Sequence, residues 1–360
     1  MEVYDVAVIG LGPAGATLVR SLDSRLKVVA VDKIKAAEEN SFKKPCGGLL
    51  APDAQKALSR FNLTLPVDVL VSPQIFSVRT VDMQSGLVCH YQRHYINMDR
   101  HKFDMWQRSM IPSRVRLIEA RVKNITRCKD GFCIEFYGMN NSEKIYAKQL
   151  VGADGANSLV RRTFFPKVKM RRYLAIQQWF ADDHDSPFYS CIFDCKSTDC
   201  YAWGLSKGAS FIFGGAFSVK TAKRDFENLK TSLRLAGFSL NNPLKTEACI
   251  VLRPDGPGSF CLGGEDVFLV GEAAGFISPS SLEGISYAIN SGYLLSLCLV
   301  PGKKDPHKAY RKKTYKMRLK LMTKNLKGIF MYQPFLRGLV MKSGLKSVSV
   351  VAAPSDAADS

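Results

Sequence analysis

Three glycines and an aspartate near the start of the chain have the most specific spacing in the sequence. Gly10, Gly12 and Gly15 form a G-x-G-x-x-G pattern after an apolar run, and Asp32 ends the next apolar run. In such a pattern the first glycine makes a sharp turn. The second lets a pyrophosphate approach the backbone, and the third lets a helix pack closely on the strand. The sequence therefore predicts a dinucleotide whose phosphates lie at the N-terminus of that helix, where N–H groups and the helix dipole attract anions.

The aspartate narrows the choice of dinucleotide. Asp32 follows Gly10 at the distance where a carboxylate accepts hydrogen bonds from the ribose hydroxyls of an adenosine. The same carboxylate repels a 2′-phosphate. We therefore expect FAD or NAD in this site, and not NADP.

Two further glycine clusters follow apolar runs. Gly152-Ala-Asp154-Gly155 ends one run, and Gly271-Glu272-Ala-Ala-Gly275 ends another. Such clusters can serve packing alone, but after the first pattern they are typical of a nucleotide domain. Each cluster places a carboxylate, Asp154 or Glu272, directly after a predicted strand.

A prolyl turn with two glycines, Pro45-Cys46-Gly47-Gly48, marks a place where the backbone passes close to another group. Two interpretations of Cys46 stay open at this point. Its thiol can protonate a substrate or relay redox equivalents. Alternatively, cysteine is simply a small residue packed in a crowded loop.

Tyr201, Trp203 and Lys207 form a third group. Residues two apart on a strand face the same side, so both rings can line one apolar pocket. The lysine at its end can meet an anionic head such as a diphosphate as a point charge. The alternative is an ordinary aromatic strand with a solvated lysine.

The elements that must position these residues belong to two domains. Strands alternate with helices around the glycine patterns, whereas 75–81, 87–91 and 175–217 are typical of a second, antiparallel sheet. A meander is expected from strands at 115–118, 132–137 and 144–147. The predicted organisation is a discontinuous nucleotide domain (1–70, 98–162, 262–300), a sheet domain (71–97, 163–261), a basic helical region (301–347) and a disordered tail (348–360).

Composition restricts the setting of the protein. The 360 residues carry ten cysteines and a net charge of +19, and the first residues do not resemble an export signal. We therefore expect reduced thiols and a cytoplasmic protein, and peripheral attachment at the inner face of the membrane stays open. Cys191, Cys195 and Cys200 suggest a metal site, but their spacing is irregular and no C-x-x-C occurs, so no metal is predicted.

The positive charge is concentrated near the C-terminus. Between Lys303 and Lys346 there are 14 lysines and arginines and one acid, Asp305. Apolar residues recur there at helical spacing, at Tyr315, Leu319, Met322, Leu326, Ile329 and Phe330, with lysines mostly on other faces. Two interpretations stay open: a surface helix packed on its own domain, or a helix that binds anionic lipid. Nucleic acid is not expected, because no reading motif accompanies the charge.

The combination of motifs resembles a known family. The three glycine patterns, with Asp99-Arg100 and Asp104, resemble the FAD-dependent fold of the para-hydroxybenzoate hydroxylase group. Pro45 to Gly48 and the segment Tyr201 to Lys207 are similar to the geranylgeranyl reductase family, whose signature is Tyr-x-Trp-x-Phe-Pro-Lys. KPCGGLLAPDAQ, NMDRHKFD, AIQQWFA and GEAAGFISPSSLEGISYA resemble most closely its bacterial CbrA branch, and the resemblance covers about residues 1–345.

The resemblance implies an α/β fold: a Rossmann-like FAD-binding domain, an antiparallel or mixed-sheet substrate domain and a helical C-terminus. It implies an enzyme that reduces carbon–carbon double bonds in a polyprenyl lipid. The electron donor is unidentified: no second G-x-G-x-x-G is present for a nicotinamide domain, so the donor either docks transiently or is another protein. The alternatives are an FAD-dependent monooxygenase, and a flavin-bound lipid-binding or stress protein without turnover. The implied residues are Cys46, Tyr201 and Trp203 for catalysis; Tyr201, Trp203 and Lys207 for substrate; and Gly10, Gly12, Pro13, Ala14, Gly15, Asp32, Lys33, Cys46, Gly47, Gly48, Arg100, Asp154, Gly271, Glu272, Gly275, Gly284 and Ile285 for FAD.

The sequence departs from the family pattern in three places. Leu205-Ser206 replaces the Phe-Pro of the signature, Glu272 replaces an aspartate, and Ser281 stands where many reductases have glycine. FAD binding tolerates these changes because a carboxylate remains. The prenyl-reducing activity is the property that they affect most.

Overall fold

The computed structural model describes residues 2–33, 43–138, 141–181 and 188–350. The chain divides into two compact units. The first comprises residues 1–70, 98–174 and 248–328, and the second comprises 71–97, 175–247 and 329–360. The predicted divisions after residues 70 and 97 coincide with two of these boundaries.

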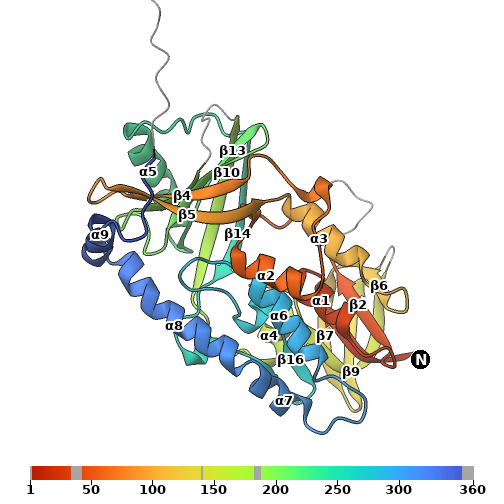
Figure 1. Ribbon diagram of the computed structural model, residues 1–360. Coiled ribbons are helices and arrows are strands. Elements are labelled where there is room, and N and C mark those ends of the chain that lie inside the picture. Colours follow the sequence, from red (N-terminus) through yellow and green to blue (C-terminus); the bar gives the residue numbers. More distant parts are fainter. Residues whose placement is uncertain (1, 34–42, 139–140, 182–187, 351–360) are drawn as a thin grey trace, which may run out of the picture. The chain divides into compact units, whose positions relative to one another are not determined.

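The first unit is built on a mostly parallel sheet in the order β15-β16-β9-β1-β2-β6, with β7 and β8 continuing from β9 (Figure 1). β1 pairs in parallel with β2 on one side and with β9 on the other. The strands are β1 Val3–Ile9, β2 Val28–Asp32, β6 Arg116–Glu119, β7 Val122–Cys128, β8 Gly131–Tyr137, β9 Ser142–Gly152, β15 Gly263–Gly264 and β16 Val267–Leu269.

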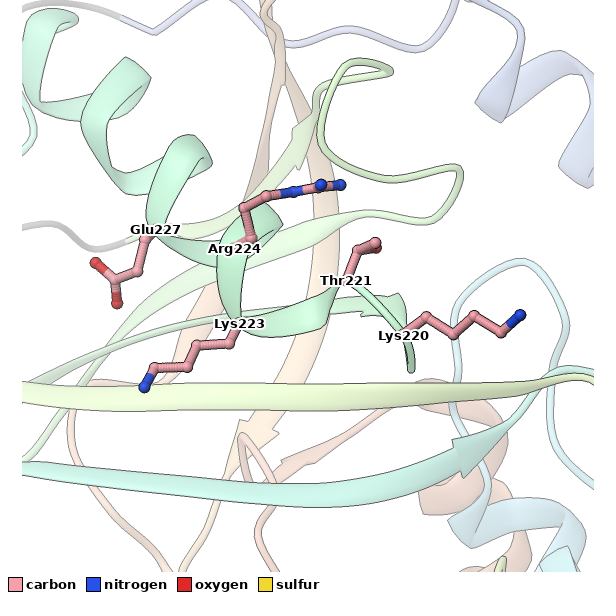
Figure 2. Close-up of a pocket in the computed structure, with 5 residues that line it drawn as sticks. All are labelled: Lys220, Thr221, Lys223, Arg224 and Glu227. Carbon is pink, nitrogen blue, oxygen red and sulfur yellow. The ribbon is translucent and has the colours of Figure 1, made fainter.

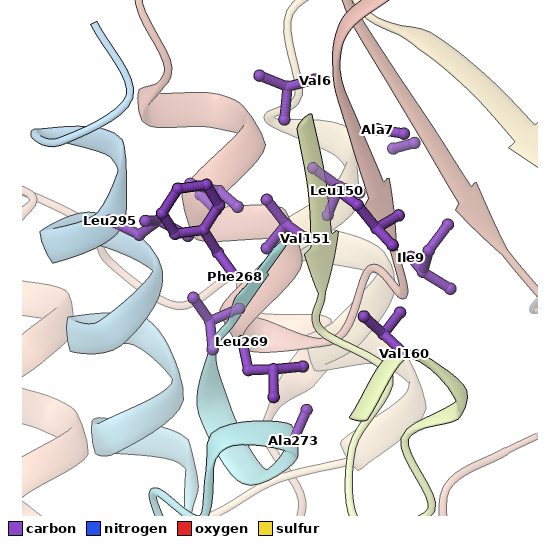
Figure 3. Packing of buried hydrophobic residues seen from close by; sticks show 14 of the residues in the cluster. Val6, Ala7, Ile9, Leu150, Val151, Val160, Phe268, Leu269, Ala273 and Leu295 are labelled. Atoms are coloured by element: carbon purple, nitrogen blue, oxygen red, sulfur yellow. The ribbon is translucent and has the colours of Figure 1, made fainter. Parts of the chain in front are cut away.

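The central strands consist almost entirely of apolar residues, because helices and sheet cover them on both faces. β2 is buried along its whole length, and the last four residues of β1 are buried as well. Figure 3 shows side chains of β1, β9 and β16 packed together with Leu295 of helix α6. This core holds β1, β9 and β16 in place, so that the three strands end at the same edge of the sheet.

Two helices pack on each other beside this sheet: α1 Pro13–Ser21 and α6 Ile285–Ser296. Small residues allow the close approach. A Cβ added to Gly292 would lie 2.3 Å from the carbonyl oxygen of Ala14. The other helices of this unit are α2 Pro52–Arg60, α3 Arg100–Ser109, α4 Leu159–Phe164, α7 Pro306–Lys313, and the short 3-10 helices η1 Val67–Val69, η2 Pro257–Ser259 and η3 Gly271–Ala274; β3 is Leu49–Leu50.

The second unit is built on a mixed sheet in the order β14-β10-β13-β12-β11-β4-β5. β12 pairs antiparallel with β11 and β13, whereas β11 and β4 are parallel. Helix α5, Ala222–Leu235, covers one face, where Phe226 stacks on Phe213 of β13. The strands are β4 Ile75–Asp82, β5 Val88–Asn97, β10 Arg172–Ala181, β11 Tyr189–Phe193, β12 Ala202–Lys207, β13 Ser210–Ser218 and β14 Lys245–Leu252.

The C-terminal region forms several helices rather than one. After α7 come α8, Tyr315–Tyr332, and α9, Pro334–Lys342. The chain breaks between them because Pro334 lacks an N–H and disfavours helix at the residue before it. Residues 351–360 of the predicted disordered tail lie outside the described residues; Val348 donates a hydrogen bond from its N–H to the carbonyl of His90 at 2.8 Å.

Other predicted elements differ in detail. The meander consists of β7, β8 and β9, while the strand predicted at 115–118 is β6, which pairs in parallel with β2. The sequence pattern missed β7 because only one of its side chains is buried. Segments 163–174 and 248–261, predicted for the sheet domain, lie in the first unit, where Arg253 donates to the carbonyl of Arg171 at 3.0 Å.

Candidate active site

The glycine motifs of the first unit lie at one edge of its sheet. The register aligns Ile9 with Val31 and with Gly152, and Gly152 with Leu269. The chain therefore leaves β1, β2, β9 and β16 at the same edge, the position where open α/β sheets bind their ligands. Sequence patterns far apart in the chain converge there.

The first turn has the geometry that the G-x-G-x-x-G spacing predicts. Gly10 has φ +96°, and a Cβ on it would lie 2.6 Å from the carbonyl oxygen of Ala153. A Cβ on Gly15 would lie 2.0 Å from the carbonyl oxygen of Gly10. A Cβ on Gly12, in contrast, would meet no described heavy atom within 4 Å. Two of these glycines are thus required by packing, and the third borders open space.

The open space lies at the start of α1. Gly12 is the N-cap of this helix, and no side chain of the described residues caps it; Pro13 occupies the first turn and Ala14 is buried. The amide groups of the first turn are therefore available to an anion, which the helix dipole also attracts.

Asp32 closes the other side of the turn. Its buried carboxylate accepts a hydrogen bond from the N–H of Leu11, which ties the end of β2 to the glycine turn. The guanidinium of Arg108, on α3, lies 3.9 Å from Asp32 and donates to Glu119 at 3.1 Å. Lys33 follows β2 and is exposed.

Asp154 occupies the turn after β9. Its Oδ2 accepts hydrogen bonds from the N–H groups of Leu159 at 2.6 Å and Val160 at 3.3 Å, at the start of α4. Its Oδ1 is buried and has no hydrogen-bond partner among the described residues. Burial raises the pKa of this carboxyl group, although these hydrogen bonds and one to Ser158 oppose the shift. An unpaired acceptor of this kind is a place where a ligand hydroxyl or amide can donate.

Replacing Asp154 with asparagine is expected to stabilise the flavin-free protein at neutral pH. A carboxyl whose pKa is raised by folding costs stability once it is ionised, and asparagine keeps an acceptor for Leu159 and Val160 without that charge. We expect the Tm to rise by about 2–4 °C at pH 7, and the gain to shrink as the pH falls toward the unfolded pKa of about 3.9. Thermal unfolding of both proteins across this range measures it; an equal effect at every pH would contradict this account.

Glu272 links three segments of the first unit. Its Oε1 accepts from the N–H of Leu252 at 3.0 Å, and its Oε2 lies 3.2 Å from the ammonium of Lys44. The carboxylate raises the pKa of Lys44 above its ordinary value. The glutamate that replaces the family's aspartate is therefore used to hold Lys44, next to the prolyl turn.

The prolyl turn places Cys46 beside a buried ion pair. The Cys46 sulfur accepts hydrogen bonds from the N–H of Gly48 at 3.4 Å and from Nη1 of Arg100 at 3.7 Å. The Nε of Arg100 donates to both carboxylate oxygens of Asp104, at 3.0 and 3.1 Å. Although burial lowers the pKa of Arg100, Asp104 and Cys46 raise it above its usual value. Gly47 lies between these contacts, half-buried.

A second cysteine lies close to the same turn. The Cys249 thiol donates to the carbonyl of Pro45 at 3.7 Å, and burial raises its pKa to about 11. This thiol stays protonated at neutral pH. The sequence pattern gave no indication of it, since Cys249 is about 200 positions from the turn.

The third glycine cluster turns the chain toward α6. Gly271 and Gly275 have φ of +58° and +85°, and a Cβ on Gly275 would lie 2.2 Å from the carbonyl oxygen of Ser259. Gly284 is the N-cap of α6 and Ile285 its first residue, and no described side chain caps this helix. It is the second helix N-terminus of the site with amides available to a ligand.

Arg161 connects the second and third glycine clusters. This buried side chain donates from Nη1 to the carbonyl of Ala273 at 2.7 Å and from Nη2 to that of Ala156 at 2.5 Å. Sequence reasoning singled out neither Arg161 nor Lys44. A signal was present in both cases: a basic short helix after Gly155, and a lysine directly before the prolyl turn.

In the second unit, Tyr201 and Trp203 lie side by side. Their ring centroids are 5.9 Å apart, with Trp203 on β12 and Tyr201 directly before its first residue. The Trp203 ring covers Gly214 of β13, where a Cβ would lie 2.8 Å from its Cε2. Its indole Nε1 is buried and has no hydrogen-bond acceptor among the described residues. The indole is thus an unused donor beside an apolar surface.

Lys207 is not a solvated lysine. Its side chain is buried, and its ammonium donates to Oδ1 of Asn97 at 2.7 Å. Asn97 in turn donates to the carbonyls of Pro73 and Ser206, both at 3.0 Å. A diphosphate would have to compete with Asn97 for this ammonium.

Other candidate sites are less informative. Among the described residues, no three His, Cys, Asp or Glu side chains are grouped to hold a metal ion. Cys191 is half-buried, Cys195 exposed and Cys200 buried. A shallow depression at the start of α5 contains none of the predicted site residues (Figure 2); its lining consists of Lys220, Thr221, Lys223, Arg224 and Glu227.

Comparison with known proteins identifies the family. A CbrA protein of Escherichia coli O6:H1 is 48% identical over 349 residues, which span 97% of this chain and 95% of that protein. The chain belongs to the CbrA family. A CbrA protein of Shigella flexneri is 47% identical, again over 97% of this chain and 95% of the relative. A search against protein-family models gave no match.

Solved structures that superimpose on this chain confirm the predicted fold class. A geranylgeranyl bacteriochlorophyll reductase-like protein from Thermoplasma acidophilum superimposes with a TM-score of 0.79 at 18% identity, over 94% of this chain and 91% of that one. A p-nitrophenol 4-monooxygenase from Pseudomonas putida gives 0.71 at 16% identity, over 95% and 93%. The fold is of the para-hydroxybenzoate hydroxylase type, with a helical C-terminus. No helix within the described part of the chain has the length and hydropathy of a membrane span.

Proposed function

We propose that this CbrA-family chain is an FAD-dependent oxidoreductase that reduces carbon–carbon double bonds of a polyprenyl lipid. The observation that carries the first part is the sheet edge where β1, β2, β9 and β16 end together, with open space above Gly12. The family resemblance and the fold of the reductase-like Thermoplasma protein support the second part.

The residues present fit FAD. The uncapped N-terminus of α1 would hold the pyrophosphate, and Asp32 would accept from the adenosine ribose. The unpaired Oδ1 of Asp154 would accept from a further hydroxyl, and the N-terminus of α6 would face the negative part of the ring system. When bound, FAD supplies hydride transfer.

The residues of the chain must supply the proton that accompanies the hydride. The hydride and the proton together add two hydrogens to one double bond of the lipid, and no other group of the lipid is reduced. We assign the proton to the Cys46 thiol, because the Arg100 guanidinium 3.7 Å away compensates the negative charge left on sulfur. The Tyr201 and Trp203 rings would pack on the isoprenoid chain.

An anaerobic experiment tests this function. The purified yellow protein is reduced with dithionite, polyprenyl alcohols and diphosphates are added, and flavin absorbance near ~450 nm is followed with mass spectrometry of the lipid. We expect reoxidation with a gain of two hydrogens in the lipid. A Cys46→Ser variant should still bind and reduce FAD but turn over about 100-fold more slowly or worse, as for loss of an acid catalyst. Equal rates in both proteins would remove Cys46 from the mechanism.

The same experiment separates the alternatives. The fold is also that of a p-nitrophenol 4-monooxygenase, which makes an FAD-dependent monooxygenase the second candidate. Flavin that stays reduced with lipid present, and reoxidises only when oxygen is admitted with hydroxylation of an added substrate, would favour it. Lipid binding without any change in flavin redox state would indicate a binding protein without turnover.

A further inference from the structure

A second thiol lies within a short distance of Cys46. The Cys249 sulfur, on β14, donates to the carbonyl of Pro45 at 3.7 Å. The Pro45–Cys46 peptide bond is trans, so this oxygen is about 2.8 Å from the Cα of Cys46. The Cys249 sulfur therefore lies no more than about 6.5 Å from that Cα. In a disulfide each sulfur lies about 4 Å from the partner's Cα, so a bond between the two cysteines requires only a small approach.

The charges around the prolyl turn act on both thiols. Burial is the main cause of the raised pKa of Cys249, and the negative charges of Glu272 and Cys46 add to it. The pKa of Lys44 is raised mainly by Glu272, with smaller contributions from Cys249 and Cys46. Lys44 and the two cysteines therefore belong to one cluster of the first unit, close enough for their charges to interact.

The turn that carries Cys46 can supply the approach. Gly47 and Gly48 follow the cysteine directly, and Gly48 has φ +67°. Glycine backbone has access to conformations that side chains forbid, so this turn can move at low cost. Cys249, in contrast, lies within β14, whose backbone pairs with β10. We therefore expect Cys46 to move toward Cys249 rather than the reverse.

The hydrogen bonds of the two thiols give them different roles. The Cys46 sulfur accepts from the N–H of Gly48 and from Arg100, and both donors favour negative charge on sulfur. A thiolate is the form that attacks an oxidant. The Cys249 thiol donates to a carbonyl and stays protonated. Both cysteines are half-buried, so a small oxidant can reach them. Cys46 is therefore the thiol that reacts first, and Cys249 is the thiol that closes the bond.

We propose that Cys46 and Cys249 form an oxidisable dithiol, which a hydroperoxide converts to a disulfide. In the first step the Cys46 sulfur attacks the peroxide and the O–O bond breaks. Cys46 becomes a sulfenic acid, and an alcohol leaves, or water in the case of hydrogen peroxide. In the second step the Cys249 sulfur attacks that of Cys46, the S–O bond breaks, and the hydroxyl leaves as water with the Cys249 proton. The two thiols lose two electrons, and the peroxide gains them.

The disulfide would also stop the reaction proposed above, because Cys46 would no longer carry a proton to donate. This consequence rests on the proposed function, whereas the formation of the disulfide does not. A dithiol reductant returns both thiols by exchange and would restore the reaction.

Peptide mapping of the full-length protein tests the dithiol. The reduced protein is treated with stoichiometric hydrogen peroxide under anaerobic conditions, and free thiols are blocked with N-ethylmaleimide. A digest with trypsin and chymotrypsin is then examined by mass spectrometry. The test variant is Cys249→Ser, in which serine keeps a donor for the Pro45 carbonyl. Its control is Cys128→Ser/Cys195→Ser, which removes the two exposed cysteines.

We expect the wild type and the control to lose two hydrogens per chain and to yield a linked peptide that joins Cys46 to Cys249. In Cys249→Ser this link is lost, and dimedone instead traps the sulfenic acid on Cys46. Dithiothreitol should return the wild type to its reduced mass. Two results would overturn the proposal: a link from Cys46 to a different cysteine, or oxidation of Cys128 and Cys195 while Cys46 and Cys249 stay unlinked.

Turnover is measured separately from the disulfide. The oxidised wild type should reduce the lipid about 100-fold more slowly than the reduced form, as for loss of an acid catalyst, and should recover with dithiothreitol. Full activity of the oxidised form would contradict the role of the Cys46 proton. A protein that forms the disulfide but reduces no lipid in either form would refute the proposed function and uphold the dithiol.

Discussion

Replacing Gly15 with alanine is expected to cost the protein about 3 kcal/mol of stability. The added methyl would lie 2.0 Å from the carbonyl oxygen of Gly10 and 3.2 Å from the Cβ of Ala153. The first of these is backbone of the turn after β1, where the Gly10 N–H donates to the carbonyl of Val31 at 2.8 Å, so it cannot rotate away, and α1 must shift off the sheet. Denaturant unfolding of the flavin-free variant measures the loss.

The neighbouring Gly12→Ala variant is the matched control. A methyl there meets no described atom within 4 Å, and the backbone φ of −65° suits alanine. We expect its stability to stay within about 0.5 kcal/mol of the wild type. If the pyrophosphate of FAD occupies this space, Gly12→Ala should nevertheless lose flavin affinity tenfold or more. A destabilised Gly12→Ala, or one with unchanged flavin affinity, would contradict the assigned site.

Replacing Arg337 with methionine is expected to destabilise the second unit by about 3–5 kcal/mol, because it leaves a buried charge without its partner. Asp82 is fully buried, and Arg337 donates to it at 2.7 Å while lying 4.9 Å above the ring of Phe193. Burial alone would raise the pKa of Asp82, but the hydrogen bonds from Arg337, Ser85 and Gln84 lower it.

The pH dependence of the stability and two further variants test whether the unpaired charge of Asp82 causes this loss. The stabilisation from Asp82 is present above its unfolded pKa of about 3.9 and is lost as the pH falls through the lower, folded value. In Arg337→Met the deficit should therefore be largest at neutral pH. Adding Asp82→Asn should recover much of it. Arg25→Met breaks an ion pair of the same 2.7 Å length whose arginine is 68% exposed, and should cost far less stability than Arg337→Met, because water screens an exposed pair; equal costs for both arginines would refute the burial argument.

The sequence was sufficient to predict the nucleotide-domain fold because its signals are local. Gly10 to Asp32 contains a strand, turn, helix and strand in one stretch, and each glycine cluster marks a strand end. The pairing of the strands was not predicted correctly. Nothing local distinguishes β6, which joins the parallel sheet at Asp32, from a strand of the meander. β7 has a single buried side chain, so its alternation is too weak to detect.

The candidate site shows the same limit at the level of side chains. Asp32 and Asp154 were found because they follow strands directly. Lys44 was missed because its partner Glu272 is 228 positions away. The expectation of a solvated or phosphate-binding Lys207 did not foresee Asn97, which is 110 positions earlier and holds its ammonium. Long-range ion pairs of this kind have no periodicity from which they can be predicted.

Because the chain is synthesised from its N-terminus, the Asp82–Arg337 pair can form only late in synthesis. The two residues are separated by 255 positions, so at ~5–20 residues per second the carboxylate waits roughly 13–50 s for its guanidinium. Until then the second unit has a charged residue at a position that the finished protein buries. Nascent chains stalled before residue 337 should therefore expose this sheet to proteases and chaperones, and the last helix acts as the closing step of folding.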